Sequence, residues 1–284
     1  MAENNKQNLL RIGMAQLLVE GGEPERNFER AEVMIKDASS KDCQIILLPE
    51  CMDLAWTHPS SEKEAKSIPG EYSDIICKLA RKYSIYICCG LTEEQDGKVY
   101  NSAILVSDDG QIILKYQKIN VLEIARKIYE TGQSLNVVDT KFGKIGLNIC
   151  SDNYEDSLDI GYVLARMGAQ LILSPSSWTS DFSVTEIDDA YGKKWLSPYS
   201  YLAKSFDLII VSATSVGTIV GGPYEGKKMV GCSLAVGSEG VLARGNYNEF
   251  AGELVVAAFN VPLPRHTGTE VSKLIKIAEE RLKF

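Results

Sequence analysis

Hydrophobic positions along the chain follow a helical period in some segments and an extended period in others. Residues 23–38 place apolar side chains at helical spacing, and Pro24 suits the first turn because its ring fixes φ near the helical value. Residues 43–48 follow as a continuous apolar run that Pro49 stops. Such a run is typical of a strand covered on both faces. We therefore predict a helix followed by a buried strand.

The same two periods continue to the end of the chain. Further strands are predicted at residues 10–17, 85–90, 100–107, 111–116, 144–149, 171–173, 208–213, 231–236 and 253–260. Further helices are predicted at residues 72–83, 157–167, 196–206 and 270–282. No linker-like stretch interrupts this series, so we predict one domain over residues 1–284. Within it we expect residues 1–8 to be flexible and the C-terminal helix, 270–284, to be available to an oligomer interface.

Two segments of the chain are similar to each other. Residues 43–49 and 169–175 each place an apolar strand after a helix and before a proline. A duplicated helix–strand–loop unit predicts an α/β sandwich in which two sheets pack together with helices outside. Chance similarity between short apolar strands is the alternative.

Composition and charge exclude several classes of function. The net charge of −8 and the scattered basic residues argue against a nucleic-acid partner, and no apolar run approaches the length of a membrane helix. Seven cysteines in no regular framework, with no recognisable export signal, favour free thiols in the cytoplasm. With two histidines and no CxxC pair, a zinc site is not expected, and we predict no metal or other cofactor.

Three reactive side chains stand at the ends of predicted strands. Glu50 follows the run 43–48, Lys118 lies just past the strand 111–116, and Cys150 follows the strand 144–149. Strand ends and the loops beyond them are where reactive groups converge in sheet proteins. A carboxylate beside a thiol can take its proton, and a fixed cation can stabilise a developing oxyanion. Taken singly, each residue also fits a structural role.

These residues belong to a series of short segments whose order and spacing are more specific than any single member. The segments are Ile12-Gly-Met-Ala-Gln16, Asn27-Phe28, Leu47-Leu-Pro-Glu50, Gly90, Tyr100-Asn-Ser-Ala103, Tyr116-Gln-Lys118, Gly146-Leu-Asn-Ile-Cys150-Ser-Asp152, Gly231-Cys-Ser233 and a turn at Gly240. In this series the chain resembles the nitrilase superfamily of carbon–nitrogen hydrolases over nearly its full length. The resemblance implies a four-layer α-β-β-α sandwich.

The resemblance also implies a catalytic triad. Cys150 would attack the substrate carbon, and Glu50 would act as the general base and then as the acid. Lys118 would stabilise the oxyanion with help from the backbone N–H of Ser151, and its charge would favour the thiolate. Asp152 is expected to cap the turn after the nucleophile. The implied substrate is a small amide or an N-carbamoyl amine, cleaved through a thioester.

Further site residues follow from the resemblance with alternatives. Many members carry a second glutamate between the lysine and the cysteine, for which we select Glu123 over Glu130. Thr131 stands where relatives have a proline, and this departure blurs the alignment. Tyr154 and Trp178 are expected near the pocket mouth, with a core position for Trp178 equally open.

The functional alternatives are a nitrile-hydrolysing enzyme and a non-catalytic member of the same fold that binds a small molecule or a partner. A glutaminase module feeding ammonia to a separate chain is a third. The family's habit of assembly implies a homodimer or a higher homo-oligomer.

Overall fold

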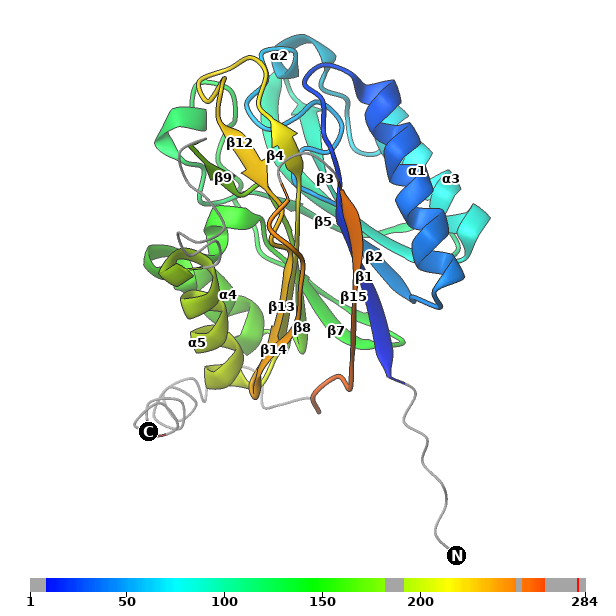
Figure 1. The fold of residues 1–284 in the computed structure, drawn as a ribbon, viewed down its shortest axis with the longest axis vertical. Coiled ribbons are helices and arrows are strands. Elements are labelled where there is room, and N and C mark those ends of the chain that lie inside the picture. The colour runs from blue at the N-terminus through cyan, green and yellow to red at the C-terminus, as the bar shows by residue number, and fades with distance from the viewer. Residues whose placement is uncertain (1–8, 182–191, 249–251, 264–279, 281–284) are drawn as a thin grey trace, which may run out of the picture.

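The computed structural model describes residues 9–181, 192–248, 252–263 and 280, and most of its strands belong to two six-stranded sheets (Figure 1). The first sheet has the order β15-β1-β2-β3-β4-β5. Its strands are β1 (Leu10–Gln16), β2 (Ile45–Leu47), β3 (Tyr86–Gln95), β4 (Lys98–Val106), β5 (Ile112–Gln117) and β15 (Glu253–Phe259). β1, β2 and β3 are parallel, whereas β4, β5 and β15 join antiparallel.

The second sheet has the order β14-β13-β10-β8-β7-β6. Its strands are β6 (Val137–Thr140), β7 (Gly143–Leu147), β8 (Leu171–Ser176), β10 (Ile209–Thr214), β13 (Leu234–Gly237) and β14 (Gly240–Arg244). β8 has a parallel neighbour on each side, as β2 has in the first sheet. The two similar segments of the sequence therefore occupy matching central places.

One detail predicted for the two similar segments was wrong. Pro175 does not stop its strand, because β8 continues to Ser176 and pairs with β10 along its whole length. On its other side β8 pairs with β7 only as far as Leu173. Proline is tolerated where a strand has an open edge, since the missing N–H leaves no ladder bond unmade there.

Helices cover the outer face of each sheet (Figure 1). α1 (Pro24–Ser40) and α3 (Glu71–Tyr83) pack on the first sheet, and α4 (Leu158–Arg166) and α5 (Ser197–Phe206) pack on the second. The short α2 (Ser61–Glu64) lies in the loop after β2. The expected α-β-β-α layering is thus confirmed. Of the expected helices, only the one at residues 270–282 lies outside the described residues, apart from Glu280; the expected flexible start, residues 1–8, also lies outside them.

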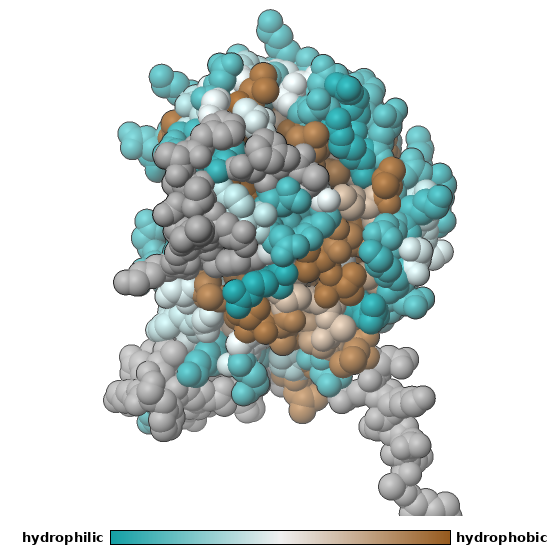
Figure 2. All heavy atoms as spheres, viewed as in Figure 1, coloured by the Kyte–Doolittle hydropathy of each residue, from teal (hydrophilic) through white to brown (hydrophobic). Residues whose placement is uncertain are grey.

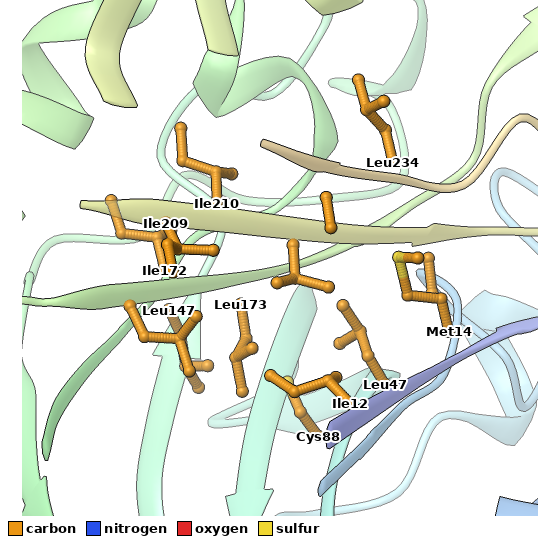
Figure 3. Packing of buried hydrophobic residues seen from close by; sticks show 14 of the residues in the cluster. Ile12, Met14, Leu47, Cys88, Leu147, Ile172, Leu173, Ile209, Ile210 and Leu234 are labelled. Atoms are coloured by element: carbon orange, nitrogen blue, oxygen red, sulfur yellow. The ribbon is translucent and has the colours of Figure 1, made fainter. Parts of the chain in front are cut away.

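The core between the sheets is apolar and closely packed. Figure 3 shows Ile12, Leu47 and Cys88 of the first sheet facing Leu147 and Leu173 of the second, and all five are at most 1% exposed. Because successive strand residues point to opposite faces, the residue after Cys88 packs against the helices instead. The burial of apolar side chains on both faces explains why these strands are continuous apolar runs in the sequence.

Several strands were not predicted. β9 (Thr179–Ser180), β11 (Val216–Thr218) and β12 (Lys228–Val230) form a small third sheet that extends from the carboxyl ends of β8 and β10. β6 and β14 are edge strands and partly exposed, so neither carries a continuous apolar run. Val241 and Leu242 of β14 are more than a third exposed, and Figure 2 shows apolar surface in this region. Within the described residues, no helix has both the length and the apolar content that a membrane crossing requires.

Candidate active site

Glu50, Lys118 and Cys150 come together at one end of the two sheets. Each follows the carboxyl end of a strand: Glu50 follows β2, Lys118 follows β5 and Cys150 follows β7. The backbone N–H of Glu50 donates a hydrogen bond to the carbonyl of Ser176 at 3.3 Å, which joins the loop of the first sheet to the end of β8 in the second. The Lys118 N–H donates to the Asn101 carbonyl at 2.8 Å and so extends the β4–β5 ladder. The site therefore lies where the two sheets meet.

The loop that carries Glu50 lies directly against β3 at Gly90. A Cβ atom at Gly90 would stand 2.5 Å from the Glu50 Cα and 2.8 Å from the Pro49 carbonyl oxygen. The Gly90 N–H donates to that same carbonyl at 3.0 Å. Gly90 therefore has a packing role: only a residue without a side chain lets the backbone of this loop approach the strand.

Cys150 occupies a strained position in the turn η2 (Cys150–Asn153). Its φ is +46°, a conformation that residues other than glycine rarely adopt. Its N–H donates to the hydroxyl of Ser174 at 3.2 Å, and this anchors the turn to β8. Strain of this kind is found at functional sites, where the surrounding structure holds a reactive group in place.

Asp152 stabilises the same turn by hydrogen bonds to its carboxylate. Its carboxylate accepts hydrogen bonds from the backbone N–H of Ile149 at 2.8 Å and of Asn120 at 2.8 Å. The Tyr116 hydroxyl donates to it at 2.7 Å. Asp152 is fully buried, and burial raises the pKa of its carboxyl group against the opposing effect of Lys118. The expected capping role fits this geometry.

The two oxygens of the Glu50 carboxylate differ in their environment. Oε1 accepts a bond from the Lys118 ammonium at 2.6 Å and another from the Asn101 side-chain amide at 2.6 Å. Oε2 is buried and has no hydrogen-bond partner among the described residues. Glu50 and Lys118 are 1% and 2% exposed, so this ion pair is shielded from water. The arrangement leaves Oε2 free to receive a proton.

Burial and charge set the protonation state of the nucleophile. The pKa of the Cys150 thiol is raised to about 12, most strongly by burial and then by the Glu50 carboxylate, and Lys118 opposes both effects. The expectation that Lys118 would favour the thiolate is correct in sign, but burial and Glu50 outweigh it. Although burial disfavours its charge, Lys118 keeps a raised pKa because the negative charge of Glu50 lies beside it. The resting site thus pairs a neutral thiol with a carboxylate and an ammonium.

A pocket of about 250 Å³ opens from these residues. Lys118 and Cys150 belong to its wall, whereas Glu50 does not line it and is joined to it through the Lys118 ammonium at 2.6 Å. Aromatic rings and lysines make up much of the rest. The full lining is Trp56, Lys118, Leu122, Cys150, Tyr154, Ser177, Thr179, Ser180, Asp181, Lys194, Trp195, Tyr224 and Lys227.

The residues expected around the triad lie in different positions relative to the pocket. Tyr154 lines the pocket. Trp178 is completely buried and stacks on Trp195 with ring centroids 4.3 Å apart, so it supports the pocket wall from the core. Ser151 is buried beside the nucleophile, and its hydroxyl donates to the Asn120 carbonyl at 2.8 Å.

The structure does not bring the expected second glutamate to the triad. Glu123 begins the 3₁₀ turn η1 (Glu123–Ala125) and is exposed, because the turn buries Ala125 and leaves Glu123 on the solvent side. The alternative, Glu130, is also exposed and lies 3.7 Å from Lys98. Neither glutamate lines the pocket.

Sequence reasoning missed Asn101, Lys194 and Trp195 as site residues. Asn101 lies in the segment Tyr100-Asn-Ser-Ala103, but nothing in its spacing along the chain indicates that its side-chain amide reaches Glu50. Lys194 and Trp195 follow a stretch without strong periodicity, and only the fold brings them to the pocket. Among the described residues, no cluster of three histidine, cysteine or acidic side chains is arranged to hold a metal ion.

Known carbon–nitrogen hydrolases are similar in sequence to this chain. A family model described as carbon-nitrogen hydrolase matches residues 11–267. Human omega-amidase NIT2 is 29% identical over 178 residues, which cover 59% of this chain and 63% of that protein. A nitrilase from Pyrococcus abyssi is 31% identical over 174 residues, which cover 60% of this chain and 65% of that protein. The chain thus spans a little under two thirds of the length of these relatives.

Solved structures with the same fold include an amidase from Nesterenkonia sp. AN1. A double mutant of that amidase in complex with acrylamide has a TM-score of 0.75 and 17% sequence identity, and the match covers 91% of this chain and 93% of the amidase. Another mutant of the amidase, at 18% identity and the same TM-score, shows the acetamide moiety of fluoroacetamide added covalently at its active-site cysteine. At these identities the likeness establishes the α/β sandwich.

Proposed function

Because the chain belongs to the carbon–nitrogen hydrolase family, we propose that it hydrolyses the C–N bond of a small amide through a thioester on Cys150. One observation carries the proposal: the Cys150 thiol lines the pocket together with Lys118, and Lys118 is paired with a buried Glu50 whose Oε2 has no hydrogen-bond partner among the described residues. A thiol with a pKa near 12 needs a base at the moment of attack, and Glu50 supplies one.

In the first half of the reaction, Cys150 forms the bond to the carbonyl carbon while its proton passes to Oε2 of Glu50. The electron pair of the C=O bond moves to oxygen, and Lys118 and the backbone N–H of Ser151 stabilise the resulting oxyanion. The tetrahedral intermediate collapses, the C–N bond breaks, and Glu50 returns its proton to the leaving nitrogen. Ammonia or an amine departs and a thioester remains.

In the second half, Glu50 takes a proton from a water molecule as that water attacks the thioester carbon. The second tetrahedral intermediate collapses, the carbon–sulfur bond breaks, and the proton on Glu50 returns to the Cys150 sulfur. The carboxylic acid product leaves. Each proton moves between the same few atoms, so one carboxylate serves both halves.

The relatives support an amide substrate. They include omega-amidases, and the structures with the same fold include an amidase, although one relative is described as a nitrilase. We favour a small amide or an N-carbamoyl amine, with a nitrile as the alternative substrate. A non-catalytic binding role is disfavoured because all three reactive residues are present and in contact or in one pocket.

The test measures ammonia release from a panel of small amides, N-carbamoyl amino acids and nitriles. We expect turnover by the wild type, loss of turnover in Cys150→Ala, and an acyl adduct of the wild type by intact-mass spectrometry. Histidine substitutions are the control, since His58 is absent from the pocket lining. Full activity in Cys150→Ala would refute the mechanism. Silence of the wild type across the panel, without an adduct, would favour the binding role.

We also propose a cytoplasmic homodimer or higher homo-oligomer. Val163 on α4 and Tyr201 on α5 are 37% and 38% exposed on the outer helical layer. These side chains give this face an apolar character that suits contact with a second copy of the chain. All seven cysteines are free and buried, as suits a reducing compartment. Light scattering at micromolar concentration should give at least twice the 31.3 kDa chain mass. A monomer mass would refute the oligomer.

A further inference from the structure

A second, narrower cavity of about 10 Å³ lies beside the substrate pocket. Trp56 and Ser177 line both spaces, so they form the boundary between the cavity and the pocket. Glu50 lines the cavity but not the pocket. It is the only ionisable side chain among the described residues that line the cavity. The general base therefore borders a space that is separate from the substrate pocket.

Ser177 connects this cavity to both reacting residues. Its hydroxyl donates a hydrogen bond to the backbone carbonyl of Glu50 at 3.4 Å. Its own carbonyl accepts a hydrogen bond from the Cys150 thiol, with 3.9 Å between sulfur and oxygen. The Oε2 atom of Glu50 is buried and has no hydrogen-bond partner among the described residues, so it can accept a proton. The cavity thus lies beside the groups to which we assign hydrolysis of the thioester.

The cavity leads from the surface of the protein to its interior. Glu50, Ser177 and Ser215 of its wall are at most 7% exposed. Thr218 and Val220 of the same wall are exposed, Val220 to 61%. A volume of about 10 Å³ is close to the minimum that one water molecule requires. The space is therefore suited to water and too small for an amide substrate.

We propose that this cavity supplies the water that hydrolyses the thioester, by a path separate from the substrate pocket. The proposal rests on the amide hydrolysis proposed above and concerns its second half. The acyl group remains in the pocket on Cys150, and water from the cavity reaches Glu50 without passing it. The water oxygen forms the bond to the thioester carbon while one of its protons passes to Glu50. The carbon–sulfur bond then breaks, and the sulfur takes up that proton.

Two variants narrow the cavity, one at each end. Ser215→Val replaces a hydroxyl at the buried end by methyl groups, and Thr218→Phe places an aromatic ring at the exposed end. Because Thr218→Phe changes only an exposed side chain, it tests the proposal even where Ser215→Val does not fold. Glu225→Phe is the matched control, since Glu225 is an exposed residue that follows β11 in the chain and lines neither the cavity nor the pocket.

The measurement makes hydroxylamine compete with water for the thioester. Hydroxylamine attacks from the place that the leaving amine occupied in the pocket, by the reverse of the first half-reaction, and gives a hydroxamate instead of the acid. In the cavity variants, we expect the ratio of hydroxamate to acid to rise about 10-fold to 100-fold, because water is no longer positioned. The kcat/KM for the amide, which reports formation of the thioester, should stay within about twofold. Glu225→Phe should match the wild type in both quantities.

The outcomes separate this proposal from the proposed function. An unchanged ratio of hydroxamate to acid in every folded cavity variant would overturn the water path and leave the hydrolase standing. A fall in kcat/KM with an unchanged ratio would also overturn it, because that pattern indicates a displaced Glu50 or a hindered exit of ammonia. If the wild type releases no ammonia and forms no hydroxamate, the proposed hydrolysis is refuted, and the water path with it.

Discussion

At the scale of single residues, the site depends on how the two oxygens of Glu50 are divided. Lys118 and Asn101 both donate to Oε1, so the carboxylate is held by one oxygen, while the other has no hydrogen-bond partner among the described residues. We expect Asn101→Ala to lower kcat about 10-fold to 100-fold, because a hydrogen bond to a charged group contributes about 1.5–3 kcal/mol. KM should change little, since Asn101 does not line the pocket. Steady-state kinetics on the best substrate measures both values.

Ser102→Ala is the matched control for this variant. Ser102 is the next residue of β4, equally buried, and its hydroxyl donates to Glu93 at 2.6 Å on the opposite face of the strand. It should lower the free energy of unfolding and leave kcat unchanged. If Asn101→Ala and Ser102→Ala affect kcat alike, Asn101 has no positioning role.

The charge of Glu50 has two opposite effects that one substitution separates. Glu50→Gln removes the base, so turnover should fall about 100-fold to 10,000-fold. It also removes a negative charge that raises the pKa of the Cys150 thiol, so that pKa should fall below its value of about 12. Iodoacetamide should therefore alkylate Cys150 faster in the variant at a given pH between 7 and 10, as followed by mass spectrometry.

The control for Glu50→Gln is Glu130→Gln, because Glu130 is an exposed glutamate outside the pocket. It should change neither the turnover nor the alkylation rate. Slower alkylation of Cys150 in Glu50→Gln would contradict the electrostatic account of the nucleophile.

The sequence predicted that Glu50, Lys118 and Cys150 converge, but it did not predict the exposed position of Glu123 or the place of Lys194 in the pocket, for a physical reason. Glu50, Lys118 and Cys150 directly follow predicted strands, so their convergence follows from the topology of the sheets. The choice of Glu123 depended on its distance along the chain, which does not determine which side of a 3₁₀ turn faces solvent. Lys194 reaches the pocket through tertiary packing alone, and the local sequence pattern does not indicate this position.

At the scale of elements, the fit between the Glu50 loop and β3 depends on one missing side chain. Gly90→Ala would place a Cβ 2.5 Å from the Glu50 Cα, so the loop backbone must shift. Overpacking of this kind costs about 1–3 kcal/mol of stability. Since the shift moves the general base, we expect kcat to fall at least about 10-fold as well. Thermal unfolding and kinetics together measure the two effects.

Gly146→Ala in β7 provides the comparison. The nearest atoms to a Cβ there belong to the end of the Leu164 side chain, at 3.2 Å and 3.4 Å, and a side chain can move where backbone cannot. This variant should fold with a smaller loss of stability and retain its activity. Equal activity of Gly90→Ala and the wild type would show that the loop adjusts without displacing Glu50.

The elements that sequence patterns predicted are those buried on both faces. β2 and the first halves of β8 and β10 are continuous apolar runs because one face meets the other sheet and the opposite face meets helices. β6 and β14 lie at the edge of their sheet and are partly exposed, so their sequences show neither a continuous run nor a clean alternation. Their pairing is set by β7 and β13, which local sequence does not reveal.

At the scale of the whole molecule, burial of the thiols links stability to pH. Burial raises the pKa of Cys150 to about 12 and raises those of Cys51, Cys88 and Cys89 well above their ordinary value. In the unfolded chain these thiols ionise near pH 8.5. Above that pH the unfolded state binds fewer protons than the folded state, so the free energy of unfolding decreases as pH rises. Each such thiol contributes a slope of about −1.4 kcal/mol per pH unit.

Urea unfolding at pH 7.5, 8.5 and 9.5 measures this decrease, which should steepen across the series. Cys88→Ala should lower stability at pH 7.5, because it leaves a cavity between the two sheets, yet its slope at high pH should be shallower by about 1.4 kcal/mol per unit. The two effects have opposite consequences for the pH curve, so a cavity alone does not imitate the loss of a titrating thiol. A curve for Cys88→Ala that runs parallel to the wild type would mean that this thiol ionises in the folded core as readily as in the unfolded chain.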